Sequence, residues 1–127
     1  SVLVDSNVFI DYLNKGRDPI QELLARFDPT DLVTCGVVKA EVLRGIKPLK
    51  TRAQLDSFFS VMRFANTHAT TWDRVWELAW KLDRKGSVLP LTDIIIGTCA
   101  LDEEAWVLTS DRHFDHIDGL SVIRPEF

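Results

Sequence analysis

Apolar runs and amphipathic segments alternate along the chain, and each change of spacing predicts a new element. Residues 2–4 form a short β-prone run, and apolar side chains at helical spacing follow over residues 8–13. The same order returns where a β-prone run at 32–37 leads into apolar positions spaced four apart from 38 to 46. We therefore predict that the chain opens with two strand-then-helix units.

The rest of the chain continues this pattern. It predicts helices over residues 20–27, 50–65 and 72–82, a helix that begins at an N-cap on Thr92, strands at 106–109 and 120–123, an extended piece at 64–66, and a helical or turn segment at 111–118. Strands that alternate with helices and are apolar on both faces are typical of a parallel sheet covered on both sides. The expected fold is α/β, a Rossmann-like α/β/α sandwich with a central, mostly parallel sheet.

Length and composition narrow the class of protein. The 127 residues match the usual size of one domain, so we expect residues 1–127 to form a single domain. A content of 46% hydrophobic and 27% charged residues excludes a disordered or collagen-like chain. No apolar run approaches the ~20 residues that cross a bilayer, so we expect no membrane contact and a cytoplasmic location. Cys35 and Cys99 lack disulfide-framework or zinc-site spacing and are expected to be buried thiols.

Charge is unevenly distributed along the sequence. The net charge of -4 argues against nucleic-acid binding driven by overall charge. However, residues 39–52 hold five basic side chains and only one acidic side chain, whereas residues 93–118 hold seven carboxylates and one arginine. A nucleic-acid enzyme with a basic contact surface and an acidic site therefore remains compatible with the sequence.

Several carboxylates are expected to meet at one edge of the sheet. Asp5 follows the first strand and Asp111 follows the strand at 106–109, and the carboxyl ends of parallel strands share an edge. Considered alone, Asp5 and Asp93 are explained as helix N-terminal residues, and Glu41 as a solvated residue at the flank of a helix. Together they would repel one another at a cost that a divalent cation offsets. Oxygen ligands favour Mg²⁺ or Mn²⁺, and phosphodiester hydrolysis is the natural chemistry of such a site.

These carboxylates stand in four recognisable local contexts. They are Asp5-Ser6-Asn7 between a strand and an aliphatic helix, Glu41-Val42-Leu43-Arg44-Gly45, Asp93-Ile94-Ile95-Ile96-Gly97-Thr98, and Thr109-Ser110-Asp111 followed by Phe114. In this order and spacing they resemble the PIN-domain family, and most closely its small VapC-type toxin ribonucleases, over essentially the whole chain. Ser6 stands where the family usually has threonine and keeps the hydroxyl, and Gly97 and Thr98 replace two small residues.

The resemblance implies a function and a set of site residues. It implies an Mg²⁺- or Mn²⁺-dependent endoribonuclease that hydrolyses phosphodiester bonds of single-stranded RNA with metal-activated water, as the toxin of a toxin–antitoxin pair. The acidic metal cluster and catalytic centre would be formed by Asp5, Glu41, Asp93 and Asp111.

Accessory residues follow from the same comparison. Asp115 would be a fifth metal ligand, and Asn7 and Thr109 would orient the carboxylates or the substrate. The basic residues after the second strand are the expected RNA contacts or else a solvated helix face: Lys39, Arg44, Lys47 and Arg52. Because an oxygen-rich site favours hard cations, His113 and His116 are not expected to be ligands.

The family resemblance also implies protein partners. It implies a homodimer and a proteinaceous antitoxin whose peptide lies in a hydrophobic groove. Trp72, Trp76 and Trp80 share one helical stripe, which we expect to be buried in the core or between subunits.

Other function classes are less compatible with the sequence. Aspartyl-phosphate phosphatases need Asp-x-Asp after the first strand, and here Asn7 replaces the second aspartate. A receiver domain needs a lysine late in the chain, and none follows Lys85. The remaining alternative is a catalytically inactive PIN-like RNA-binding or scaffold protein.

Overall fold

A computed structural model describes all residues from 1 to 127 and contains one sheet of five strands, all parallel, in the order β3-β2-β1-β4-β5. The strands are β1 (Val2–Val4), β2 (Leu32–Cys35), β3 (Arg63–Ala65), β4 (Trp106–Leu108) and β5 (Val122–Ile123). The central strand β1 and its neighbour β2 are buried along their whole length. This explains why their sequences are continuously apolar rather than alternating.

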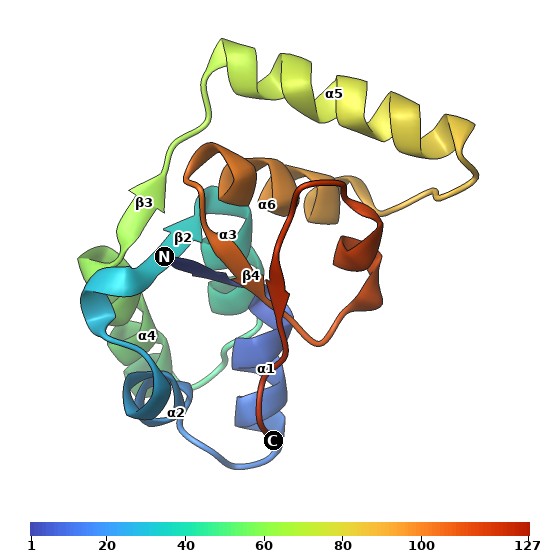
Figure 1. The fold of residues 1–127 in the computed structure, drawn as a ribbon. Helices are drawn as coiled ribbons and strands as arrows, with labels where there is room; N and C mark the ends of the chain where they lie inside the picture. Colours follow the sequence, from blue (N-terminus) through green and yellow to red (C-terminus); the bar gives the residue numbers. More distant parts are fainter.

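Helices cover both sides of the sheet. In Figure 1, α5 and α6 lie above the sheet, while α1, α2 and α4 lie below it. The helices are α1 (Ser6–Asn14), α2 (Pro19–Arg26), α3 (Gly36–Arg44), α4 (Leu49–Val61), α5 (Ala69–Arg84) and α6 (Leu91–Asp102), with short 3-10 helices η1 (Pro29–Asp31) and η2 (Arg112–His116). The expected α/β/α sandwich with a parallel sheet is confirmed.

Predicted helix boundaries are wrong at two places. The helix predicted over residues 50–65 ends at Val61, because residues 63–65 form the edge strand β3 beside β2. The N-cap of α6 is Pro90 rather than Thr92, and the helix starts at Leu91. The carbonyl of Pro90 accepts hydrogen bonds from the backbone N–H groups of Asp93 and Ile94, at 3.1 and 3.2 Å. Asp93 therefore lies in the first turn of α6, where the helix dipole favours a carboxylate.

The helix α6 is the most buried helix of the fold. Residues 94–100 are all buried, in line with the nearly continuous apolar sequence there. Gly97 allows a close approach of the segment after β4, because a Cβ at this position would lie 2.6 Å from the Cδ1 atom of Ile117. The side chain of Ile117 would have to move to accept even an alanine.

The helix α5 is much more exposed than the sequence pattern predicted. It packs on α6, and its buried side chains include Val75 and Leu82, which are 2% and 3% exposed. The tryptophans lie outside this contact stripe, and Trp72, Trp76 and Trp80 are 47%, 57% and 53% exposed. The expectation that they are buried in the core is wrong, since α5 forms the outer layer of the fold (Figure 1).

Other sequence expectations concern the thiols and membranes. Cys35 and Cys99 are both buried free thiols. None of the helices combines the length and apolar character needed to span a bilayer.

Candidate metal centre

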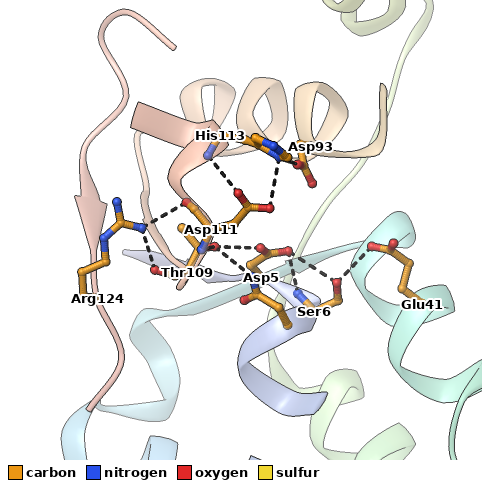
Figure 2. Close-up of polar contacts among 9 residues, drawn as sticks. Asp5, Ser6, Glu41, Asp93, Thr109, Asp111, His113 and Arg124 are labelled. Carbon is orange, nitrogen blue, oxygen red and sulfur yellow. Dashed lines mark hydrogen bonds and ion pairs between the residues drawn. The ribbon is translucent and has the colours of Figure 1, made fainter. Parts of the chain in front are cut away.

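The candidate site lies where the order of the strands reverses. The chain passes from β1 outward to β2 and β3, and then returns to add β4 and β5 on the other side of β1. Asp5 directly follows β1, and Asp111 follows β4, which pairs with β1 in parallel. Open α/β sheets bind ligands in the crevice at such a switch point. Figure 2 shows the side chains that gather there.

Asp5 is a buried carboxylate held by two donors. It is 3% exposed, and its Oδ1 and Oδ2 atoms accept hydrogen bonds at 2.8 Å from the Ser6 backbone N–H and the Thr109 hydroxyl. Burial is the main cause that raises the pKa of Asp5 to about 6; the nearby charges of Asp93 and Glu41 also raise it, and the two donors lower it in part. The expected helix N-cap at Asp5 is confirmed, and its charge lacks any direct cationic partner.

Thr109 connects Asp5 to the loop after β4. Its hydroxyl donates to Asp5 and accepts from the Asp111 backbone N–H at 2.9 Å and from Asn7 Nδ2 at 3.3 Å. A hydroxyl has one proton and two lone pairs, so all of its capacity is used. Because the side chain is fully buried, Thr109 sets the position of both Asp5 and Asp111. The orienting role of Asn7 and Thr109 in the reaction remains a prediction.

Glu41 joins the site through a hydroxyl. Its carboxylate lies on α3, beside the apolar stripe as the sequence indicated, and accepts a hydrogen bond from Ser6 Oγ at 3.1 Å. The same hydroxyl lies 3.4 Å from Asp5 Oδ1. Ser6 therefore bridges Asp5 and Glu41. The sequence signal for this role is the hydroxyl, which both serine and threonine supply at this position of the motif.

The remaining two acidic residues meet around a histidine. His113 Nδ1 lies 2.8 Å from Asp93 Oδ2 and 3.2 Å from Asp111 Oδ2. Hydrogen bonding to Asp93 raises the pKa of His113, and burial raises the pKa of Asp93 although His113 partly opposes that change. One donor atom from each of the three residues lies within 4.8 Å of the others, so a single ion fits among them.

Packing of η2 against α6 brings these residues together. Asp111 is the N-cap of η2 and accepts the backbone N–H of His113 at 2.9 Å. Phe114 is fully buried, and a Cβ on Gly97 would lie 3.9 Å from its ring, which shows how closely η2 approaches α6. The aromatic residue of the Thr-x-Asp-x-x-Phe motif is thus the anchor that holds Asp111 and His113 beside Asp93.

Asp115 does not join this cluster. Both of its carboxylate oxygens lie 2.7 Å from Arg124 Nη2. A fifth ligand at Asp115 would need this side chain to face the same way as Asp111, but η2 is a 3-10 helix with three residues per turn, so residues four apart diverge. The geometry does not fit the predicted metal-ligand role of Asp115.

Arg124 is a structural part of the site that sequence reasoning missed. Its Nη1 atom donates to the backbone carbonyls of Thr109 and Asp111, at 3.0 Å each (Figure 2). Its Nη2 atom binds Asp115. The guanidinium therefore ties β5 to the loop that carries Asp111. It follows the last strand with no local motif around it, so no sequence signal marked it.

The predicted RNA contacts lie outside the acidic cluster. Lys39 is paired with Asp56 at 3.3 Å, whereas Arg44, Lys47 and Arg52 are exposed. Their role as phosphate contacts remains a prediction.

The donor set fits a divalent cation. Several carboxylates converge at this partly buried edge of the sheet, and burial raises the pKa values of Asp5 and Asp93, with neighbouring carboxylates adding to the effect. Beside them, Asn7 Oδ1 is a buried oxygen without a hydrogen-bond partner. Carboxylate and amide oxygens are the ligands that Mg²⁺ and Mn²⁺ accept in proteins. Asp93 and Asp111 would hold the ion directly, with Asp5 and Glu41 completing the acidic cluster.

Comparison with known proteins agrees with the fold. In Rickettsia felis, Ribonuclease VapC2 is 27% identical over 126 residues, which cover 93% of this chain and 92% of that protein. The solved structure of VapBC2 from Rickettsia felis, bound to a promoter DNA fragment, has a TM-score of 0.80 at 22% identity and covers 98% of both chains. A toxin–antitoxin complex from Klebsiella pneumoniae has a TM-score of 0.75 at 26% identity, covering 99% of this chain and 98% of that chain.

The family resemblance of the four acidic segments is confirmed by a family model that matches nearly the whole chain. The family model described as the PIN domain matches residues 2–120, which include all four acidic segments. Because the match spans nearly the full length, the chain belongs to the PIN-domain family.

Proposed function

We propose that this protein is an Mg²⁺- or Mn²⁺-dependent endoribonuclease that cuts single-stranded RNA, and that it is the toxin of a toxin–antitoxin pair. The observation that carries the proposal is the convergence of Asp5, Glu41, Asp93 and Asp111 at the switch point of the sheet. Two of them are bridged by Ser6, and Thr109 links Asp5 to Asp111. Such an acidic cluster suits a cation and the phosphate that the cation would bind.

The relatives support this choice of reaction. The curated relative is named a ribonuclease, and the two solved structures are of a VapBC pair and of a toxin–antitoxin complex. This chain retains carboxylates at all four positions at which the family resemblance placed them. An intact acidic site favours an active nuclease over an inactive RNA-binding scaffold.

Some of these residues would bind the ion, and others hold the ion-binding carboxylates in position. A bound divalent ion would supply an acidified water and stabilise the charge that develops on the phosphate. Thr109 and Ser6 hold Asp5 and Glu41 in place through hydroxyl contacts, so the carboxylates need not reorganise during the reaction. Arg124 fixes the loop that carries Asp111. Arg44, Lys47 and Arg52 would contact RNA phosphates.

The test is a cleavage assay with the purified protein. Single-stranded RNA should be cut with Mg²⁺ or Mn²⁺, duplex RNA of the same sequence should resist, and EDTA should stop the reaction. Asp93→Asn should be inactive. Asp118→Asn is the matched control, because this carboxylate is 91% exposed and lies outside the cluster. Cleavage at the same rate in EDTA would contradict the metal mechanism, and no cleavage with any ion would favour the inactive scaffold.

The protein partners follow from the same proposal. A groove of about 450 Å³ lies between α1, α3 and the start of α4, and its apolar lining includes Ile10, Leu13, Val42, Ile46 and Pro48. We assign this groove to the antitoxin peptide, and the exposed tryptophans of α5 to a homodimer contact. Co-expression with the antitoxin should protect the groove residues from hydrogen exchange, whereas unchanged exchange there would contradict the assignment.

A further inference from the structure

The ring of His113 lies in the gap between two proposed metal ligands. Its Nδ1 atom is within 3.2 Å of carboxylate oxygens from both Asp93 and Asp111. The donor atoms of the three residues lie within 4.8 Å of one another. Ligands about 2.1 Å from a shared ion lie roughly 3 to 4 Å apart, so this spacing is close to that of one coordination shell.

The backbone directs the ring toward this gap. The backbone N–H of His113 donates to Asp111 Oδ1, and the next residue, Phe114, is fully buried against α6. The histidine therefore has little freedom at its Cα. Its side chain is nevertheless 45% exposed, which leaves one side of the ring open to incoming solvent and ions.

We propose that His113 is a nitrogen ligand of the cation held by Asp93 and Asp111, and that this ligand makes the site select Mn²⁺ over Mg²⁺. The inference rests on the proposed metal site but not on RNA as the substrate. To bind the ion, Nδ1 must be unprotonated, so the bound ring would be the neutral tautomer with its proton on Nε2. A doubly protonated ring would first release its Nδ1 proton to water, and the contacts of Nδ1 to the carboxylates would be replaced by the bond to the ion.

The selectivity follows from ligand chemistry. Mg²⁺ strongly prefers oxygen and gives up its water ligands reluctantly. Imidazole nitrogen is a good ligand for first-row transition metals, whose affinity for mixed nitrogen and oxygen sites rises from Mn²⁺ onward. An Asp93–Asp111–His113 site therefore favours Mn²⁺ more strongly than four carboxylates alone would.

A different arrangement is possible on the same scaffold. The ring of His113 is half-exposed, so it has room to rotate into solvent and leave an all-oxygen site when the ion enters. The two arrangements differ in one measurable property, which is whether a nitrogen atom is bonded to the ion.

The experiment measures metal binding without RNA. Pulsed EPR of the Mn²⁺-loaded parent should show coupling to a ligand ¹⁴N nucleus. The coupling should be absent from His113→Ala and His113→Gln. It should be unchanged in His116→Ala, which removes the other histidine of η2, a side chain outside the cluster. Thermal unfolding in EDTA should be similar for all four proteins, which confirms that they fold.

Affinity gives a second, independent reading. In His113→Ala the Kd for Mn²⁺ should rise about tenfold or more, the range seen when partners of a metal site are removed. The Kd for Mg²⁺ should change much less, so the preference for Mn²⁺ is lost. An uncoupled Mn²⁺ signal in the parent, an unchanged Mn²⁺-to-Mg²⁺ ratio in the variant, or no Mn²⁺ binding at all would each overturn the proposal. Nitrogen coupling without RNA cleavage would instead overturn only the proposed function.

Discussion

The two halves of the acidic site hold their charges in different ways. The buried half consists of Asp5, Ser6 and Thr109, where the carboxylate is 3% exposed and is held by neutral hydroxyl and amide donors. The open half consists of Asp93, Asp111 and His113, where side chains are 14%, 30% and 45% exposed. The open half also contains a group that can carry a positive charge, whereas the buried half has none.

This difference separates two tasks within one site. The buried half is a rigid anchor, since its donors are all committed and solvent does not reach it. The open half is accessible to solvent, so ions can enter it. An ion that enters there competes with His113 for the carboxylates of Asp93 and Asp111. We expect substitutions in the two halves to differ in their effects on catalysis, stability and metal choice.

The largest expected effect is on catalysis and comes from the anchor. Asp5→Asn should reduce RNA cleavage by more than about 100-fold, beyond the range typical of residues that only support metal ligands. The amide keeps the shape and its oxygen can still accept from the Ser6 N–H, but its NH2 group cannot accept from the Thr109 hydroxyl, and it is a poorer partner for a hard cation. Single-turnover cleavage with saturating Mn²⁺ measures this loss. A residual rate near that of the parent would show that only the open half is catalytic.

The next effect tests Thr109 as a positioning residue. Thr109→Val should lower cleavage by about 10- to 100-fold. The lost hydroxyl bond should also raise the pKa of Asp5, since that bond now holds it down. The acidic limb of the pH–rate profile should therefore move to higher pH, and Thr109→Ser should restore it. A lower rate with an unmoved profile would indicate a structural role only.

A third effect concerns the stability of the metal-free protein. The pKa of Asp5, about 6 against the ordinary value of 3.8, corresponds to about 3 kcal/mol. Folded protein keeps this proton where the unfolded chain has lost it, so the Asp5 contribution to stability falls as pH rises from about 4 to about 6. At pH 7.5 Asp5→Asn should be more stable than the parent by up to about 3 kcal/mol.

The open half should respond more weakly in the same measurement. Asp93→Asn also removes a carboxylate with a raised pKa, but it loses the contact to His113, so its metal-free stability should be equal to or slightly above that of the parent. Urea unfolding in EDTA from pH 4.5 to 7.5 measures both variants against the parent. If the free energy of unfolding of the parent and of Asp5→Asn depends on pH in the same way, the buried charge of Asp5 is contradicted. A large destabilisation by Asp93→Asn would make Asp93 a structural partner.

The smallest effect on the site should come from substitutions in α5, which is exposed and lies away from the acidic residues. Trp76→Gln should leave metal binding unchanged and alter the free energy of unfolding by about 0.5 kcal/mol or less, as is usual at the surface. It should weaken self-association in sedimentation velocity. Trp106→Gln is the control, because this tryptophan is 48% exposed on β4, outside α5. A parent that stays monomeric at high concentration would refute the α5 dimer contact.

Local chemistry explains what the sequence predicted well. The apolar runs identified β1, β2 and β4, and Asp5 was recognisable as a helix cap because it depends only on its own neighbours. The placement of Asp5 and Asp111 on one sheet edge followed from the rule that parallel strands end together. The boundary error at Thr92 is also local, since Pro90 competes with threonine to begin the helix.

The sequence by itself determined the alternation of elements, the sheet edge on which the carboxylates gather and the family to which the chain belongs. Only the tertiary structure decided that His113 contacts Asp93, that Arg124 forms an ion pair with Asp115, and that the tryptophans of α5 remain exposed. These outcomes link residues that are distant in the sequence or depend on which layer covers a helix. They follow from strand order and from packing such as that of Phe114 against α6, and no spacing within a single segment encodes them.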